Sequence, residues 1–201
     1  MCAADRDPWS YHPRFVAGSE ELFAAVRDDV AWTSQMKSRQ TASMGIPYNY
    51  AGASYPENAW HPGVRRVADE VEHVFGFAVT NCLLNRYPTG EHTIGWHADD
   101  VAILAPGTGI VIVSLGATRT MLLRTGEAGG WVYERIALAA GSALFMSEGL
   151  QATHKHGIKR EQGATERISL TFRHLTHAPP PVDAPRWSSV TPAGRKKERE
   201  V

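Results

Sequence analysis

The chain has 201 residues, of which 43% are apolar and 21% charged, a composition typical of a globular domain with a hydrophobic core. Lysine and arginine equal aspartate and glutamate in number, so the net charge of zero argues against a broadly basic nucleic-acid-binding surface, although a local basic groove stays compatible with it. No stretch is long and apolar enough to span a membrane, the N-terminus has no signal-peptide core, and two cysteines give no disulfide framework, so we expect a monomer in the reducing cytoplasm.

The first half of the chain predicts two helices. Residues 1–18 are expected to be irregular, and Ser19 then caps an amphipathic stretch that begins with two acidic residues, which the helix dipole favours. A second helix is predicted over residues 63–76, closed by a glycine. The loop over residues 44–63 is rich in glycine, proline and aromatic residues, as are many loops that contact ligands and some that merely pack on a core.

The second half of the chain predicts strands. Short runs rich in β-branched and aliphatic residues follow one another, separated by glycine, proline or charged residues. These runs are FAVTNCLLNRY, GIVIVSLG, TRTMLLR, WVYERIAL, SALFMS and RISLTFRHL. Helices followed by many strands predict one mainly β domain over residues 19–177, a sandwich or barrel with helices packed against one side. Residues 178–201 are proline-rich and charged, so we expect them to form a flexible tail.

A histidine–aspartate motif suggests a metal site. The segment GWHADD places His97 and Asp99 two residues apart, and on an extended backbone both side chains then point to the same face. A third ligand must come from elsewhere, and His154 and His156 lie on a later segment of the predicted β region. Two histidines and one carboxylate are the ligands of non-haem Fe(II) oxygenases. The alternative is a surface histidine beside an acidic pair, or only a turn.

Two arginines near the end of the predicted core suggest an anionic ligand. Arg167 and Arg173 are six residues apart on a predicted strand, so they face the same side, and the residues between them are largely apolar. A buried guanidinium needs an anion, and a dicarboxylate offers one carboxylate to each arginine. The alternative is that both arginines reach solvent at the ends of the strand.

Together these segments resemble the AlkB-type Fe(II)/2-oxoglutarate-dependent dioxygenases. The resemblance runs from about Arg39 to His174 and rests on NRYPTG, IGWHADD, IVIVSLGATRTMLLR, GSALFMSEGLQATHKHGIK and ERISLTFR, in the family's order and spacing. It implies a double-stranded β-helix, a jelly-roll of two sheets with N-terminal helices packed on one of them. It also implies Fe(II), the cosubstrate 2-oxoglutarate and O₂, with hydroxylation of a C–H bond as the reaction.

The resemblance also implies roles for individual residues. His97, Asp99 and His156 would hold the iron and so be catalytic, and His156 is preferred to His154 because it precedes Gly157-Ile158-Lys159, as the family's third ligand precedes a similar stretch. The residues that would bind 2-oxoglutarate are Asn85, Tyr87, Arg167, Ser169 and Arg173. Among these, Arg167 would pair with the distal carboxylate and Arg173 would lie near Asp99. Ser169 stands where family members often carry asparagine, and it can still donate a hydrogen bond.

The resemblance constrains the substrate less. In the repair members, aromatic residues before the core stack on a flipped base, and Tyr48 and Tyr50 match that place, although they could also pack on the sheet edge. Asp100 and Val101 follow the iron motif and would lie near the substrate. Repair members commonly carry an acid where this chain has Val101, and valine cannot contact a base edge in that way.

Three functions are compatible with these features. The first is oxidative demethylation of N-alkylated bases in DNA or RNA, for which Lys37 and Arg39 could contact phosphate. The second is hydroxylation or dealkylation of a small molecule, such as a nucleoside or secondary metabolite, which Val101 and the zero net charge leave open. The third is a non-catalytic binding module, against which the intact triad and both arginines count.

Overall fold

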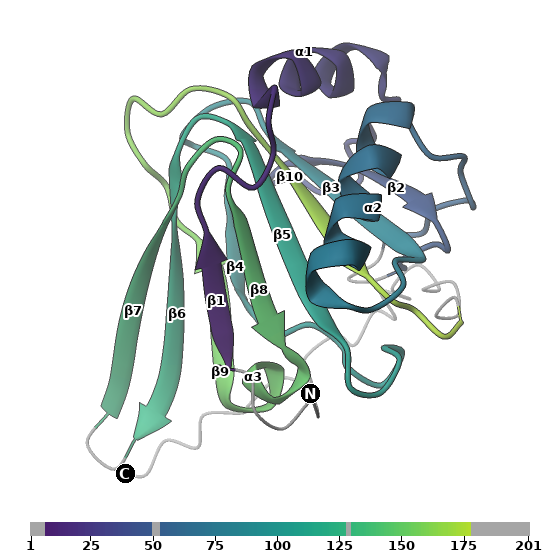
Figure 1. Cartoon of the computed structure of the whole chain (residues 1–201). Coiled ribbons are helices and arrows are strands. Elements are labelled where there is room, and N and C mark those ends of the chain that lie inside the picture. The colour runs from purple at the N-terminus through teal and green to yellow at the C-terminus, as the bar shows by residue number, and fades with distance from the viewer. Residues whose placement is uncertain (1–6, 50–52, 128–129, 178–201) are drawn as a thin grey trace, which may run out of the picture.

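The computed structural model describes residues 7–49, 53–127 and 130–177, which form two antiparallel sheets and three helices (Figure 1). The strands are β1 (Trp9–His12), β2 (Gln40–Gly45), β3 (Asn81–Tyr87), β4 (Ile94–His97), β5 (Gly109–Gly116), β6 (Arg119–Glu127), β7 (Gly130–Leu138), β8 (Ala143–Ser147), β9 (His154–Ile158) and β10 (Arg167–Arg173). The helices are α1 (Ser19–Asp29), α2 (Pro62–Phe75) and α3 (Glu148–Thr153).

The strands divide into a six-stranded sheet, in the order β1-β8-β5-β10-β3-β2, and a four-stranded sheet, in the order β4-β9-β6-β7. Helices α1 and α2 cover the outer face of the six-stranded sheet, and its inner face packs against the four-stranded sheet (Figure 1). This arrangement confirms the predicted mainly β jelly-roll with helices packed on one sheet. None of the described helices is long and apolar enough to cross a bilayer.

The sequence of β10 shows how alternation builds both sides of the larger sheet. Ile168, Leu170 and Phe172 are fully buried in the core beneath the helices. The residues that alternate with them, from Arg167 to Arg173, point the other way into the space between the sheets, where they line a cavity. β5 and β3 flank β10 within the sheet, the helices cover one of its faces and the four-stranded sheet covers the other, so all seven of its residues are buried.

Helices α1 and α2 follow the predicted positions with one correction at an end, whereas α3 was not predicted. Gly76 closes α2 in the left-handed region at φ 71°, as its position predicts. Ser19, however, is the first residue of α1 and makes no capping hydrogen bond. The cap position belongs to Gly18, which adopts φ 64°, a backbone conformation that glycine reaches without steric cost.

The N-terminal segment differs from the expectation of irregular structure. Trp9–His12 form β1, which pairs with β8 at the edge of the six-stranded sheet, so the folded part begins before residue 19. Four isolated residues gave too short a pattern to identify β1 from sequence. Residues 178–201, predicted as a tail, lie outside the described residues.

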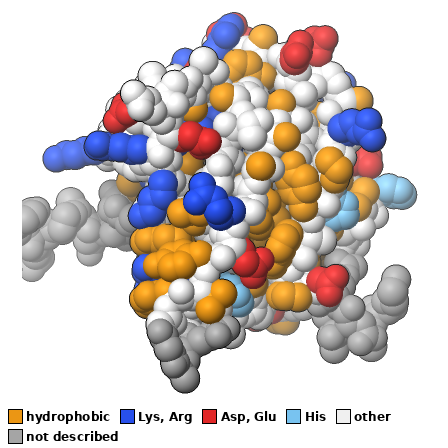
Figure 2. Space-filling model, turned by 90° about the vertical axis from the view of Figure 1, so that its left-hand side faces the viewer, with side chains coloured by type: hydrophobic (Ala, Val, Ile, Leu, Met, Phe, Trp, Pro, Cys, Tyr) orange, Lys and Arg blue, Asp and Glu red, His pale blue; other side chains and the backbone are white. Residues whose placement is uncertain are grey.

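The end of the β6–β7 hairpin extends beyond the core. The first six residues of β7 are exposed, including Trp131 and Tyr133, whereas Ile136 and Leu138 are buried. Figure 2 looks onto this side of the molecule and shows hydrophobic side chains beside lysines and arginines.

Candidate metal centre and cosubstrate pocket

The pairing of β4 with β9 brings two histidines together. His97 ends β4 and lies directly opposite His156 of β9 in the antiparallel register. Side chains opposite one another in such a pair share a face of the sheet, and the two imidazole centroids are 4.3 Å apart. Asp99 follows β4 after one residue, which returns its carboxylate to the same side.

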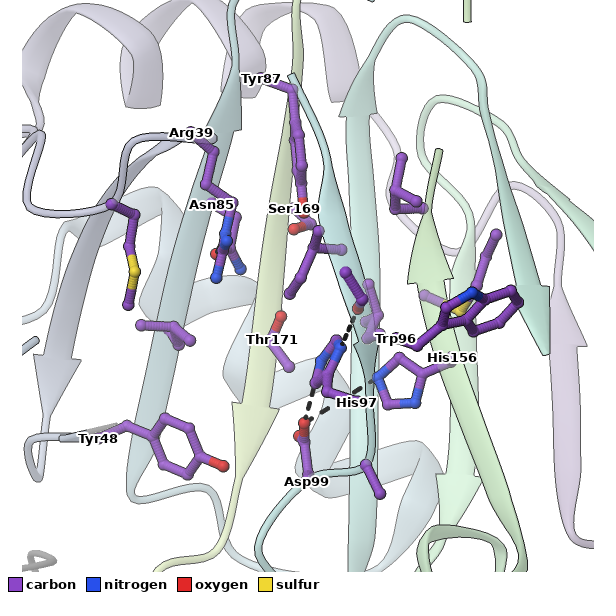
Figure 3. A pocket seen from close by; sticks show the side chains of 18 of the residues that line it. Arg39, Tyr48, Asn85, Tyr87, Trp96, His97, Asp99, His156, Ser169 and Thr171 are labelled. Atoms are coloured by element: carbon purple, nitrogen blue, oxygen red, sulfur yellow. Dashed lines mark hydrogen bonds and ion pairs between the residues drawn. The ribbon is translucent and has the colours of Figure 1, made fainter. Parts of the chain in front are cut away.

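These three side chains form a compact group between the sheets (Figure 3). Asp99 Oδ1 lies 3.6 Å from His97 Nε2 and 4.0 Å from His156 Nε2. One ligand atom from each residue lies within 4.8 Å of the other two, close enough for all three to hold one metal ion. His154 lies apart from this group, at the end of α3, where its Nδ1 is 2.8 Å from Thr153 Oγ1.

Neighbouring groups orient two of the three side chains, His97 and Asp99. His97 Nδ1 donates to the Gly95 carbonyl at 2.9 Å, which leaves Nε2 as the nitrogen that faces the group. Arg173 donates to Asp99 Oδ2 from Nε at 3.0 Å and from Nη2 at 2.5 Å, so Oδ1 remains for a metal. The backbone N–H of Asp99 donates to Gln151 Oε1 at 3.0 Å, a contact from α3 that the sequence did not indicate.

The protonation states suit metal binding. Burial by itself would raise the pKa of Asp99, but Arg173 and the two histidines outweigh it and lower that pKa to about 2. Burial lowers the pKa of His156 to about 4, although Asp99 acts in the opposite direction. At neutral pH the site therefore presents a carboxylate and a neutral imidazole, the forms in which these side chains bind metals.

A cavity of about 370 Å³ adjoins this group and is lined by the polar residues of β10 and β3. The register of these strands pairs Arg167 with Tyr87 and Ser169 with Asn85, so the residues expected to bind 2-oxoglutarate lie side by side. In Figure 3, Tyr87, Asn85 and Ser169 lie along the strands on one side of the triad. The structure thus brings together residues that the sequence separates by eighty positions or more.

Arg167 is a buried cation whose hydrogen-bonding capacity is only partly used. It is 1% exposed, and its Nη2 donates to Ser114 Oγ at 2.8 Å. Its Nε and Nη1 are buried and have no hydrogen-bond partner among the described residues. Burial lowers the pKa of this guanidinium, yet an arginine keeps its proton under ordinary conditions. These donors therefore fit an anionic group placed in the cavity.

Arg173 has a different environment. Besides its two bonds to Asp99, its Nη1 donates to the Thr171 carbonyl at 3.4 Å, and its guanidinium lies 4.1 Å from the Tyr48 ring centroid. The expectation that each arginine binds one carboxylate of the ligand is therefore revised. Arg167 is available to an external carboxylate, whereas Arg173 holds the carboxylate of Asp99.

Arg39 is a cavity residue whose place the sequence did not indicate. It is 5% exposed, and its Nε donates to Asn85 Oδ1 at 2.6 Å. A buried side chain in the cavity wall is not placed to contact phosphate at the surface, whereas Lys37 is exposed. Because Asn85 Oδ1 accepts from Arg39, its amide nitrogen is the group left for a ligand.

The residues expected near the substrate occupy different positions. Tyr48 is buried in the cavity wall, and Asp100 lines the cavity while its Oδ1 accepts from the Ala102 N–H at 2.9 Å. Val101 instead packs against the core between the sheets and is not among the lining residues. Tyr50 lies outside the described residues. Trp96, which precedes His97, also lines the cavity and was not singled out from sequence.

Comparisons with known proteins agree with this geometry. Residues 15–173 match the family model described as the 2OG-Fe(II) oxygenase superfamily. The human DNA oxidative demethylase ALKBH2 is 32% identical over 152 residues, which are 72% of this chain and 58% of that protein. The human alpha-ketoglutarate-dependent dioxygenase alkB homolog 3 is 32% identical over 170 residues, 80% of this chain and 58% of that protein. The chain thus spans less than two thirds of the length of these relatives.

The fold is also found in a solved structure. That of OsALKBH1 superposes with a TM-score of 0.63 at 15% identity, covering 84% of this chain and 97% of that one. The superfamily implies Fe(II), 2-oxoglutarate and O₂ as the cofactor and cosubstrates, and the His-Asp-His group and the partly unsatisfied Arg167 fit them. The chain therefore belongs to the 2OG-Fe(II) oxygenase superfamily, as an AlkB-type member.

Proposed function

We propose that this chain removes alkyl groups from the nitrogens of bases in DNA or RNA by oxidation, using Fe(II), 2-oxoglutarate and O₂. The observation that carries the proposal is the combination, in one cavity, of a three-ligand metal group with a buried arginine whose Nε and Nη1 lack partners. The similar human proteins ALKBH2 and alkB homolog 3 are a DNA oxidative demethylase and an alpha-ketoglutarate-dependent dioxygenase, which supports the same reaction class.

The metal group has a defined part in this reaction. His97, Asp99 and His156 would hold the iron, and Arg173 would keep the Asp99 carboxylate oriented toward it. Bound iron, with 2-oxoglutarate and O₂, supplies the oxidation of a C–H bond as the cosubstrate becomes succinate and CO₂. Hydroxylation of an N-methyl group gives an N-hydroxymethyl group. Its C–N bond then breaks, so that the carbon leaves as formaldehyde and the hydroxyl proton passes to the nitrogen.

The cavity walls would place the cosubstrate. Arg167 would bind the carboxylate farther from the iron through Nε and Nη1, while Tyr87, Ser169 and the amide nitrogen of Asn85 lie beside it. Apolar side chains complete the cavity and exclude water from the reacting atoms. They include Leu83, Ile112, Met121 and Ile158.

The solvent exposure of His97 favours a substrate base that enters the metal group from outside. The His97 side chain is 29% exposed, whereas those of Asp99 and His156 are about 5% exposed or less. A base flipped out of a nucleic acid could approach the metal from the side of His97, with Tyr48 and Asp100 beside it. A small molecule such as a nucleoside is the second candidate, since it would use the same opening.

Mass spectrometry of methylated oligonucleotides tests the proposal. Oligonucleotides that carry N-methylated bases are incubated with the protein, Fe(II), ascorbate and 2-oxoglutarate, and demethylation appears as the loss of one CH₂ from the mass. Asp99→Ala serves as the inactive control. Absence of any mass loss, together with turnover of a methylated nucleoside, would replace nucleic acid by the small-molecule substrate.

We also propose that the protein acts as a monomer in the cytoplasm. Cys82, a free thiol in the described part of the chain, is compatible with a reducing compartment.

A further inference from the structure

The outward face of the four-stranded sheet carries aromatic and basic side chains next to one another. Side chains alternate along a strand, and the buried Leu123, Ile136 and Leu138 of β6 and β7 point inward to the core. The alternate residues of β6 and β7, which point outward, and their neighbours on β4, on β9 and directly after β9 form what we term the aromatic–basic face: Trp96, Arg124, Trp131, Tyr133, Lys155 and Lys159. Figure 2 shows lysine and arginine side chains adjoining hydrophobic ones on this side of the molecule.

The side chains of this face are stacked in an ordered way. The guanidinium of Arg124 lies between two indoles, 4.4 Å from the Trp96 ring centroid and 4.3 Å from that of Trp131. The ammonium of Lys159 lies 4.8 Å from the Trp96 centroid. The strand register also pairs Arg124 with Lys155 on one side and with Tyr133 on the other. A row of two cations and one aromatic ring therefore crosses three strands.

The face is exposed and its cations are not neutralised. Trp131 and Tyr133 are each 53% exposed, among the largest values for big hydrophobic side chains in the described ranges. The Nε of Arg124 is buried against its neighbours without a hydrogen-bond partner, and none of the ion pairs found in residues 7–49, 53–127 and 130–177 includes Arg124, Lys155 or Lys159. Exposed aromatic rings beside unpaired cations mark a surface suited to an anionic ligand with flat rings.

The face is continuous with the cavity. Trp96 both lines the cavity and belongs to the face, and it directly precedes His97. An extended ligand that leaves the metal group past Trp96 would reach Arg124 and then Trp131, since each of these side chains contacts the next. The aromatic–basic face thus begins where a substrate base would enter.

We propose that the aromatic–basic face binds the single-stranded nucleic acid that flanks the base held in the cavity, an inference that rests on the proposed function. Unpaired bases stack on Trp131 and Tyr133, and the phosphates between them pair with Arg124, Lys155 and Lys159. A duplex would not use the exposed rings, because its base faces are already stacked. A protein partner or a second copy of the chain is the alternative occupant.

Binding measurements with matched variants test the face. The probe is a fluorescein-labelled single-stranded oligodeoxythymidine, followed by fluorescence anisotropy. The double variant Trp131→Ala/Tyr133→Ala should weaken binding by roughly 30-fold or more, from the usual contribution of two stacked bases. Trp131→Phe keeps a stacking ring and should bind close to wild type. The control Arg66→Ala/Val74→Ala alters an exposed cation and an exposed apolar side chain on α2, and should leave binding unchanged.

A charge variant separates phosphate contacts from packing. Lys155→Glu changes an exposed side chain, and it should weaken binding and lower the slope of log affinity against log salt by about 0.7 for one lost phosphate contact. The proposal would be overturned if Lys155→Glu and the double variant bound the oligonucleotide as tightly as the α2 control does. That result, with a dimer in sedimentation analysis that the double variant dissociates, would assign the face to a second copy.

Turnover measurements distinguish this inference from the proposed function. The double variant should lose activity on a methylated oligonucleotide and keep it on a methylated mononucleotide, which is too short to reach the face. Equal loss on both substrates would place Trp131 and Tyr133 in support of the catalytic centre and overturn the binding role. A wild-type protein that neither binds nor demethylates any oligonucleotide would instead refute the proposed function, and the inference with it.

Discussion

Replacing Arg167 with methionine is expected to weaken cosubstrate binding strongly without unfolding the protein. Nε and Nη1 of Arg167 are buried donors without partners among the described residues. A hydrogen bond to a charged group contributes about 1.5–3 kcal/mol, so two such bonds correspond to about 3–6 kcal/mol. Since 1.4 kcal/mol is tenfold in affinity, the Kd for 2-oxoglutarate should rise by roughly 100- to 10,000-fold.

The same substitution should change the stability of the ligand-free protein far less. Methionine removes a buried cation that lacks a counter-ion, which favours folding, and it also removes the bond to Ser114, which opposes folding by about 1 kcal/mol. The free energy of unfolding without ligand should therefore change by about 1 kcal/mol. In contrast, the wild-type protein should gain about 2.7 kcal/mol at a 2-oxoglutarate concentration of about 100 Kd, and Arg167→Met should lose this gain.

Isothermal titration calorimetry with Mn(II) in place of iron measures the binding without turnover, and urea denaturation measures the stability. Arg66→Met, on the surface of α2, is the control for removal of an arginine charge. Arg167→Lys keeps the charge but offers other donor geometry, so its Kd should fall between those of wild type and methionine. Binding by Arg167→Met within about threefold of wild type would refute the assignment of Arg167 to the cosubstrate, because it lies below the loss of even one charged hydrogen bond.

Three further predictions address the metal ligands, the cavity wall and the fold. His156→Ala should abolish Mn(II) binding in calorimetry and His154→Ala should retain it, whereas the reverse would exchange their roles. Arg39→Met should raise the KM for 2-oxoglutarate by about tenfold or more with a smaller change in kcat, because the amide of Asn85 loses its orienting bond. A tenfold fall of kcat at unchanged KM would contradict this prediction. Gly76→Ala should lower the free energy of unfolding by about 1–2 kcal/mol in urea denaturation, because its φ of 71° is unfavourable for alanine, and an unchanged midpoint would contradict this.

The sequence predicted features that repeat with a short period or lie close in the chain. Alternation along RISLTFR predicted that Arg167 and Arg173 share a face, and the structure places them both on the cavity side of β10. The spacing of His97 and Asp99 likewise predicted two side chains on one side. Both predictions need only the geometry of an extended backbone.

The contacts that the sequence did not predict depend on distant segments. Arg39 binds Asn85 across 46 positions, and Gln151 reaches Asp99 across 52, so no local pattern marks either residue. Strand alternation alone did not show that the anion beside Arg173 is Asp99, and only the family resemblance placed these two residues near each other. Such pairings follow from strand order, which short motifs do not specify.

The most direct test of the central claim is the stoichiometry of formaldehyde and succinate released from a methylated oligonucleotide. We predict one formaldehyde for each succinate with the wild-type protein, and neither product above background with Asp99→Ala. Succinate formed without formaldehyde from any methylated oligonucleotide would show that the metal group and cosubstrate pocket operate on a different substrate. Formaldehyde release by Asp99→Ala at the wild-type rate would contradict the assignment of the metal group itself.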